Sequence, residues 1–471
     1  MDYQIFIKGE DRTDRIKDWS RVGDRIQIVY SDGKSYMYGK DNVEIIESAL
    51  LDKKGNNVFE YLKRIATVVS LENEQVGNIL EHQYSKIDFV SSKSVLANFL
   101  TAKLPESQKT ISNVIFPFGY NESQKIAVEK ALANDLSIVE GPPGTGKTQT
   151  ILNIIANAVR LGESVAVVSG NNSATKNVQE KLEKYNVDFI SAYLGSVENK
   201  RVFIDNQEKK SLPNIKEWEL SQGKKNEIET NLQLLSSQLD EKLRQKNRLA
   251  ELRQMRDALL IEYKHFDKNY HAGKSDLYDD FLKNKNSDKI AEIAIFVENY
   301  KFREKHDNWY KVIKWFERLK LYFRYGIIDK AAFKDKTEIF ISICHDQFYT
   351  KKIEEITTEI DSIEKELKYF DFEEKMKRYS EFSMQFFRDK LASKYADKDR
   401  QVFSQNELWK DPNKFIEEYP VILSTTYSLR SSLSSKTIYD YVIIDESSQV
   451  NLATGALALS CARKAVIVGD L

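Results

Sequence analysis

The stretch that decides the fold is GPPGTGKT, which consists of Gly141, Pro142, Pro143, Gly144, Thr145, Gly146, Lys147 and Thr148. An apolar run at 136–139 precedes it, and a helical pattern at 148–161 follows it. A phosphate-binding loop has this spelling and requires a strand before it and a helix after it. The stretch therefore predicts a nucleotide site at the carboxyl end of a strand, in a protein of the α/β class.

Each residue type in this loop has a chemical reason. Glycines let backbone N–H groups surround phosphates, and the amino end of the helix adds its positive dipole. Lys147 is expected to neutralise charge on the β- and γ-phosphates, and the Thr148 hydroxyl to coordinate Mg²⁺. Gln149, the next residue, is assigned to the same site. The expected ligands are ATP and Mg²⁺.

Strand and helix patterns alternate around the loop, which is typical of a parallel sheet. Residues 164–169 predict a strand and residues 174–185 a helix. The pattern stops near residue 200 and resumes near Val421. We therefore expect residues 115–200 and 418–471 to form one α/β domain, into which residues 201–417 are inserted.

Two acids, Asp445 and Glu446, end the apolar run at 441–444. Ligands of parallel α/β sheets bind beyond the carboxyl ends of the strands. Asp445 is expected to hold Mg²⁺ through water, and Glu446 to orient and activate the attacking water. Such a run is, by itself, an ordinary strand that meets a solvated loop. The phosphate-binding loop upstream favours the functional interpretation.

The inserted segment predicts long helices. Apolar residues repeat at 3-4-3-4 spacing, the pattern of a coiled-coil seam, at Ile353, Ile356, Ile360, Ile363 and Leu367, and upstream at Leu232, Leu235, Leu239 and Leu243. An antiparallel hairpin, or stalk, lets the chain leave the α/β domain and return. A helical bundle is the alternative.

The tip of this insertion interleaves aromatic and basic residues between Trp309 and Tyr325. Bases could stack on the rings while phosphates pair with the cations. An amphipathic helix that packs into the lobe explains the same pattern, because the apolar residues fall on one helical face. A protein partner on the insertion is a further expectation, and a membrane surface is the least favoured one.

The first fifty residues predict a small β-rich module, with strands at 3–8, 25–30, 35–38 and 43–46. The middle two flank Ser31-Asp32-Gly33-Lys34, a hairpin turn in which Asp-Gly tolerates positive φ. Residues 51–114 are expected to form a helical connector.

Composition sets further limits. The 471 residues carry 71 Lys and Arg against 72 Asp and Glu, a net charge of −1. A globally basic nucleic-acid binder is excluded, so that any such site must be a local patch. Cys344 and Cys461 are expected to be reduced thiols. No apolar run approaches roughly 18 residues, and the amino terminus lacks a signal peptide's apolar core. We therefore expect no membrane association and a cytoplasmic location.

Several motifs together make the chain resemble the superfamily 1 helicases. Asn121-Glu122-Ser123-Gln124 precedes the loop at the spacing of the helicase Q motif. The sequence DESSQ at 445–449 is similar to motif II, the stretch at 169–174 to motif Ia, and the stretch at 468–471 to the opening of motif III. Their order and spelling most resemble the 5′-to-3′ branch, which includes the nonsense-mediated-decay helicases and related DNA helicases.

The resemblance implies a RecA-like sheet and particular residue roles. Gln124 would read adenine, with Tyr120 as a stacking neighbour, and Gln449 would sense the γ-phosphate. Glu446, Lys147 and Gln449 are then the expected catalytic residues. Contacts with the nucleic-acid backbone are implied for Asn171, Asn172, Thr425 and Thr426. These four short polar residues are equally explained as helix caps and turn formers.

The function that follows is an ATP-dependent helicase or translocase on single-stranded DNA or RNA. One rival is a nucleotide-switched adaptor that holds partners with its stalk. The other is a coiled-coil ATPase of the chromosome-maintenance type, but the stretch Arg430 to Lys436 lacks the glycines of that class's signature. The family carries a second RecA-like domain after motif III. We therefore expect the chain to be a fragment that hydrolyses ATP slowly by itself.

Overall fold

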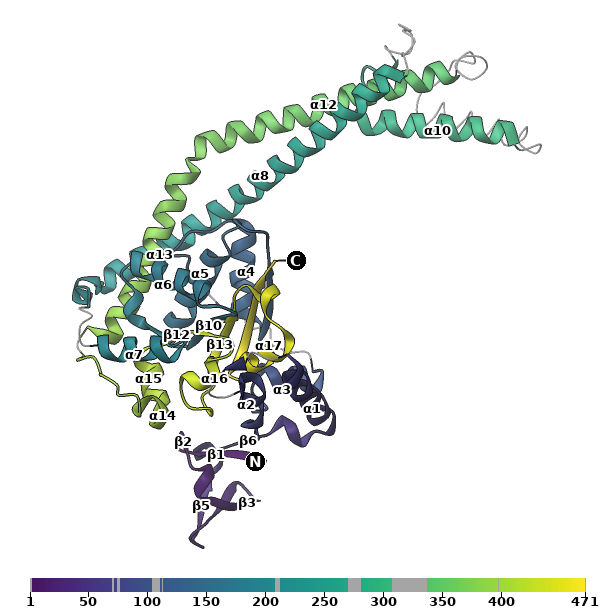
Figure 1. Ribbon diagram of the computed structural model, residues 1–471. Coiled ribbons are helices and arrows are strands. Elements are labelled where there is room, and N and C mark those ends of the chain that lie inside the picture. Colours follow the sequence, from purple (N-terminus) through teal and green to yellow (C-terminus); the bar gives the residue numbers. More distant parts are fainter. Residues whose placement is uncertain are drawn as a thin grey trace. The chain divides into compact units, whose positions relative to one another are not determined.

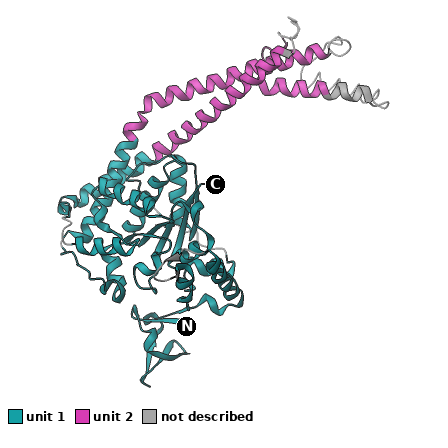
Figure 2. Cartoon of the chain, in the orientation of Figure 1, with its two compact units in different colours: residues 1–236, 376–471 teal, residues 237–375 magenta. Residues whose placement is uncertain are grey.

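The computed structural model describes residues 2–69, 72–73, 77–103, 111, 113–207, 212–269, 281–306, 337–396 and 398–470. The chain divides into two compact units, residues 1–236 with 376–471 and residues 237–375 (Figure 2). The sequence placed all of 201–417 in the insertion, whereas both ends of that segment belong to the first unit. The tip between Trp309 and Tyr325 lies outside the described residues.

A six-stranded sheet with the order β11-β12-β10-β13-β14-β9 organises the first unit (Figure 1). Every neighbouring pair is parallel, which confirms the predicted sheet. The strands are β9 (Leu136–Glu140), β10 (Val165–Ser169), β11 (Ser191–Tyr193), β12 (Val421–Thr425), β13 (Tyr439–Ile444) and β14 (Ala462–Gly469). Strands from before and after the insertion are interleaved in this order, so the two stretches fold as one domain.

Helices and short apolar strands build this core. β10 and β12 are buried at every residue, as expected when both faces of a parallel sheet are covered. In α5 every residue from Thr150 to Val159 is buried. This helix spans Lys147–Arg160, and the other helices around the sheet are α4 (Glu122–Ala133), α6 (Asn172–Lys184), α7 (Val197–Asn206), α14 (Glu407–Lys410), α15 (Pro412–Glu418), α16 (Leu429–Ser432) and α17 (Leu452–Leu459).

The register of the sheet brings the motif loops to one edge. Ser169 at the end of β10 pairs with Thr425 at the end of β12. Gly469 at the end of β14 pairs with Glu140 at the end of β9. The carboxyl ends are therefore level, and the loops that follow these strands meet along the same side of the sheet.

The amino-terminal module consists of two three-stranded antiparallel sheets, β2-β1-β6 and β3-β4-β5. Its strands are β1 (Tyr3–Ile7), β2 (Glu10–Asp11), β3 (Ile16–Val22), β4 (Arg25–Tyr30), β5 (Ser35–Gly39) and β6 (Val43–Glu47). The four predicted strands are present, and Gly33 has φ of +83° in the predicted turn. The sequence did not predict β3, because none of its residues is buried. A short β7–β8 pair (Glu72–Asn73, Gly77–Asn78) and helices α1 (Lys53–Val68), α2 (Ile79–Ser85) and α3 (Val95–Thr101) follow.

The second unit is a helical hairpin with a third helix. Its helices belong to α8 (Gln222–Asn269), α10 (Ser287–His306), α12 (Thr337–Phe370) and the start of α13 (Phe372–Tyr395). α8 and α12 run antiparallel, with Arg248–Glu359 at 3.0 Å and Lys242–Glu366 at 3.3 Å. This confirms the hairpin, and α10 packs against α12 through a core of its own. Ile356 and Ile360 share a core with Leu249 and Leu252 of α8, beyond the leucines identified in the sequence.

Candidate nucleotide-binding site

The loop between β9 and α5 has the backbone that its glycines predict. Gly144 and Gly146 have φ values of +86° and +84°, a region that side chains rarely tolerate. A Cβ at Gly141 would lie 2.7 Å from the Thr145 hydroxyl oxygen, and one at Gly146 would collide with the amide of Gln124. The loop therefore depends on these glycines for its shape.

Lys147 lies at the mouth of this loop. Its Nζ donates to the carbonyl oxygen of Gly141 at 2.7 Å. The same ammonium forms an ion pair with the carboxylate of Asp470, which follows β14. The side chain is 12% exposed, so that its charge is held at the point where the loop would meet phosphates.

Asp445 and Glu446 occupy the end of β13. The Asp445 N–H donates to the carbonyl of Val168 at 2.8 Å, which fixes the carboxyl at the edge of the sheet. Its Oδ1 accepts from the N–H of Glu446 at 3.0 Å. Burial raises the pKa of the Asp445 carboxyl above its ordinary value, while that N–H and the charges of Lys147 and Lys181 offset part of the rise.

Glu446 has an unusual backbone, with φ of +52°. Left-handed conformations cost a non-glycine residue of the order of 1–3 kcal/mol and cluster at functional sites. The turn aims the chain away from β13 into a short 3₁₀ helix, Ser447–Gln449. Glu446 is half-buried there, and Gln449 is exposed.

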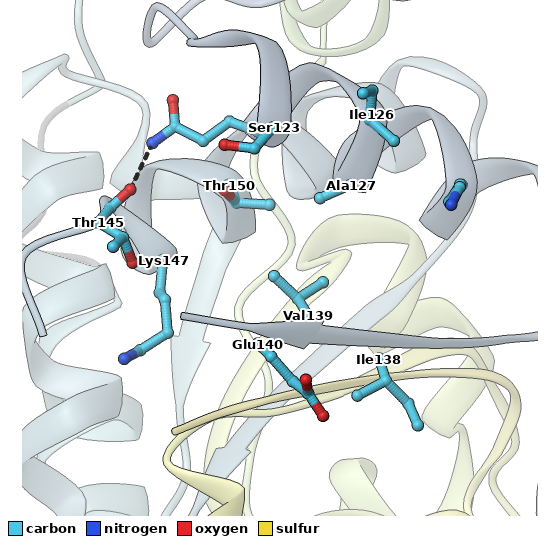
Figure 3. Close-up of a pocket in the computed structure, with 11 residues that line it drawn as sticks. Ser123, Ile126, Ala127, Ile138, Val139, Glu140, Thr145, Lys147 and Thr150 are labelled. Carbon is cyan, nitrogen blue, oxygen red and sulfur yellow. Dashed lines mark hydrogen bonds between the residues drawn. The ribbon is translucent and has the colours of Figure 1, made fainter. Parts of the chain in front are cut away.

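A pocket of about 210 Å³ opens beside the loop, between α4 and β9 (Figure 3). Its apolar lining comes from Ile126, Ala127, Ile138 and Val139, while Lys147 lines its polar side. An apolar wall next to a few polar groups is typical of small-molecule sites. The pocket can therefore hold a flat ring while the loop holds an attached phosphate chain.

Gln124 joins α4 to the loop. Its Oε1 accepts from the N–H of Asn121 at 2.8 Å, as half of a capping box. Its Nε2 donates to the carbonyl oxygens of Thr145 at 3.0 Å (Figure 3) and Gly146 at 3.3 Å. The amide thus lines the pocket and also holds the loop in place.

Tyr120 lies elsewhere than the sequence suggested. Its ring is 6% exposed and packs against Phe116, at 4.4 Å between centroids, and Tyr379, at 5.6 Å. It is absent from the pocket lining. The ring therefore belongs to the core, and this corrects the prediction that Tyr120 stacks beside the base.

The four residues expected to contact a nucleic-acid backbone separate into two pairs. Asn171 and Asn172 are exposed at the start of α6, where Asn171 caps the helix by accepting from the Ser173 N–H at 3.1 Å. Thr425 and Thr426 are only 8% and 1% exposed. The hydroxyls of these two threonines lie inside the fold, so the expectation that their side chains touch a strand is corrected.

The structure also adds residues that the sequence did not single out. Asn177 of α6 points its amide at the Thr148 hydroxyl, with 3.4 Å between Nδ2 and Oγ1. Lys181 follows one turn later and is close enough for its charge to act on Asp445. Asp470, which the sequence placed only in the stretch that resembles motif III, pairs with Lys147. Asn177 and Lys181 have no local signal, because each acts on a residue of a separate strand or helix.

These features define a class: a phosphate-loop nucleotide-binding domain with a RecA-like parallel sheet. Residues 119–471 match the AAA-domain family. The chain belongs to this family, and within it to the superfamily 1 helicases related to nonsense-mediated-decay and DNA helicases.

Curated relatives agree with this assignment over short stretches. The chain is 36% identical over 121 residues to the DNA replication ATP-dependent helicase/nuclease DNA2 of Xenopus laevis, which covers 26% of the chain and 11% of that protein. It is 41% identical over 71 residues to a Regulator of nonsense transcripts 1 homolog of Drosophila melanogaster, covering 15% and 6%. It is 49% identical over 61 residues to the DNA-binding protein SMUBP-2 of Mus musculus, covering 13% and 6%. The matched stretches are small parts of these relatives.

Two further expectations concern chemistry away from the site. Cys344 and Cys461 are both free and buried, as expected of reduced thiols. Burial raises the pKa of the Cys344 thiol to about 12. Within the described ranges, none of the helices combines the length and the apolar character that crossing a bilayer requires.

Proposed function

We propose that this chain is the ATP-binding part of a helicase or translocase that moves on single-stranded nucleic acid. The observation that carries the proposal is the convergence of Lys147, Thr148, Asp445 and Glu446 at one edge of a single sheet. These groups come from the start of α5 and from the end of β13, on both sides of an insertion of about two hundred residues. If these residues were only helix caps and turn formers, they would not need to lie at the same edge of the sheet.

The phosphates of ATP would lie in the loop at 141–148, with the base in the pocket beside Gln124. A hydroxyl on Thr148 and a carboxylate on Asp445 are the hard oxygen ligands that Mg²⁺ accepts, directly or through water. When bound, Mg²⁺ would neutralise the phosphate oxygens. Glu446 would take a proton from the attacking water, and Gln449 would report the state of the γ-phosphate.

The strand would lie along the carboxyl edge of the sheet. Asn171 and Asn172 are exposed there and offer amides to phosphate oxygens. Such contacts position a strand without reading its sequence, so that DNA and RNA are both candidate substrates. Binding dominated by phosphates weakens steeply with salt.

The test is ATP turnover by the longest natural form of the protein, with and without single-stranded DNA or RNA. Turnover that a strand stimulates, and that rising salt abolishes, supports the motor. ATP binding without turnover in the presence of either strand contradicts the motor and favours the nucleotide-switched adaptor. An Asn171→Ala Asn172→Ala variant should lose strand stimulation and keep basal turnover.

A further inference from the structure

The phosphate-loop helix α5 holds the segment that precedes α4. Asn157 accepts from the N–H of Ile115 at 3.0 Å and donates to its carbonyl at 2.7 Å. One turn earlier, Asn153 accepts from the N–H of Phe118 at 3.3 Å and donates to the carbonyl of Gly119 at 2.9 Å. Both asparagines are fully buried. Side chains four residues apart share a helix face, so these two amides bind the segment at successive turns of α5.

Gln149 lies on the same face of α5, one further turn toward the loop. Its Nε2 donates to the carbonyl of Phe118. Its Oε1 accepts from Nε2 of Gln124 at 3.2 Å. Gln124 in turn donates to the loop carbonyl of Thr145. An unbroken series of hydrogen bonds therefore runs from the segment to the phosphate-binding loop.

The other side of the segment is held by α13, within the first unit. The Ser383 hydroxyl accepts from the N–H of Phe116 at 3.2 Å. The Tyr379 hydroxyl donates to the carbonyl of Val114 at 3.3 Å. Ser383 is fully buried and Tyr379 is 2% exposed. α13 is the helix by which the chain returns from the helical insertion.

We propose that Ser383 and Tyr379 are positioning residues of the nucleotide site, which act through the backbone at 114–119, Gln149 and Gln124. The insertion is thereby connected to the ATP site by the base of its returning helix. This inference rests on the proposed function, because it concerns how tightly that site holds ATP.

The physical basis is the cost of leaving a buried polar group unpaired. Removal of the Ser383 hydroxyl leaves the Phe116 N–H without its acceptor in a dry interior. The segment then shifts to find another partner, and the Phe118 carbonyl moves with it. Gln149 and Gln124 follow, which loosens the loop that must surround the phosphates.

The experiment measures the Kd of the 1–471 chain for a fluorescent Mg-ATP analogue, at a temperature where every variant is folded. Ser383→Ala and Tyr379→Phe should each weaken binding by about 2- to 30-fold, the range seen for residues that couple distant sites. Ser393→Ala is the matched control. It lies on the same helix, but its hydroxyl bonds only the helix carbonyl of Asp389, and it should leave Kd unchanged.

A double variant distinguishes an effect that acts through the hydrogen-bond series from a general loss of stability. Because Gln149→Ala already breaks the series, adding Ser383→Ala should weaken binding by less than the product of the two single effects. An effect equal to that product overturns the proposal. So does a Ser383→Ala chain that melts at a lower temperature but keeps the unaltered Kd, since Ser383 would then only stabilise the fold.

Failure of the proposed function gives another result. If the unaltered chain does not bind the analogue, the proposed function fails, and the inference fails with it. If the unaltered chain and every α13 variant bind equally, only the inference falls.

Discussion

Lys147 and Asp470 join the loops that follow two neighbouring strands of the sheet. The ammonium of Lys147, at the start of α5, pairs with the carboxylate of Asp470, which directly follows β14. It also donates to Gly141 at 2.7 Å. Phosphates that enter the loop must compete with this carboxylate for the same ammonium. The lysine thus connects nucleotide binding to the position of the loop after β14.

Lys147→Ala should weaken ATP binding by about 10- to 100-fold without loss of fold, because a hydrogen bond to a charged group contributes about 1.5–3 kcal/mol. Titration with a fluorescent ATP analogue and thermal melting measure the two effects. Lys176→Ala, an exposed lysine on α6 paired with Glu180, is the control and should change neither. Full affinity and turnover in Lys147→Ala would remove the phosphate-loop assignment.

Glu446→Gln should keep Mg-ATP binding and slow hydrolysis by about 10²–10⁴-fold, the usual contribution of a general base. Glutamine keeps the side-chain length, and Asp445 remains to hold Mg²⁺. Single-turnover hydrolysis in the longest natural form of the protein, together with analogue binding, checks both parts. Loss of ATP binding in this variant would mean that Glu446 is needed for structure.

Deletion of residues 237–375, with a short Gly/Ser linker, should leave a folded first unit that still binds ATP. A wider deletion, of residues 215–405, should not fold. It removes Phe387, Ser383 and Asp389 from the interior, where Asp389 pairs with Lys225 at 3.0 Å. Circular dichroism and analogue binding compare the two. A folded product from the wider deletion would show that α13 is dispensable for the core.

The 1–471 chain by itself should bind Mg-ATP but hydrolyse it slowly, with little response to a single strand. The family resemblance implies that arginines from a second RecA-like domain stabilise the transition state, and such a finger contributes about 10³–10⁵ in rate. The described residues contain one parallel sheet. Steady-state turnover with and without single-stranded DNA or RNA measures this. Robust stimulation of a monomer contradicts it, and turnover that rises steeply with protein concentration indicates a second copy supplying the arginine.

Local spacing was enough to predict the parts of the site that lie within consecutive residues. Gly141 to Thr148 and the run ending in Asp445-Glu446 need only their neighbours in sequence to specify a loop and a strand end. The alternation of strands and helices around them identified the parallel sheet. The seam from Ile353 to Leu367 identified one arm of the hairpin, because heptad spacing is also a local property.

Only the tertiary structure decided which residues contact these motifs and which are buried. Thr425 and Asn171 look alike in sequence, as polar residues after apolar strands, yet packing buries one and exposes the other. Tyr120 packs against Tyr379, from a helix more than two hundred residues later. The partners of Lys147 and Phe116 are likewise distant in the chain. Sequence spacing determines which groups share an element, whereas burial and long-range contacts depend on how the elements pack, and no local pattern records that.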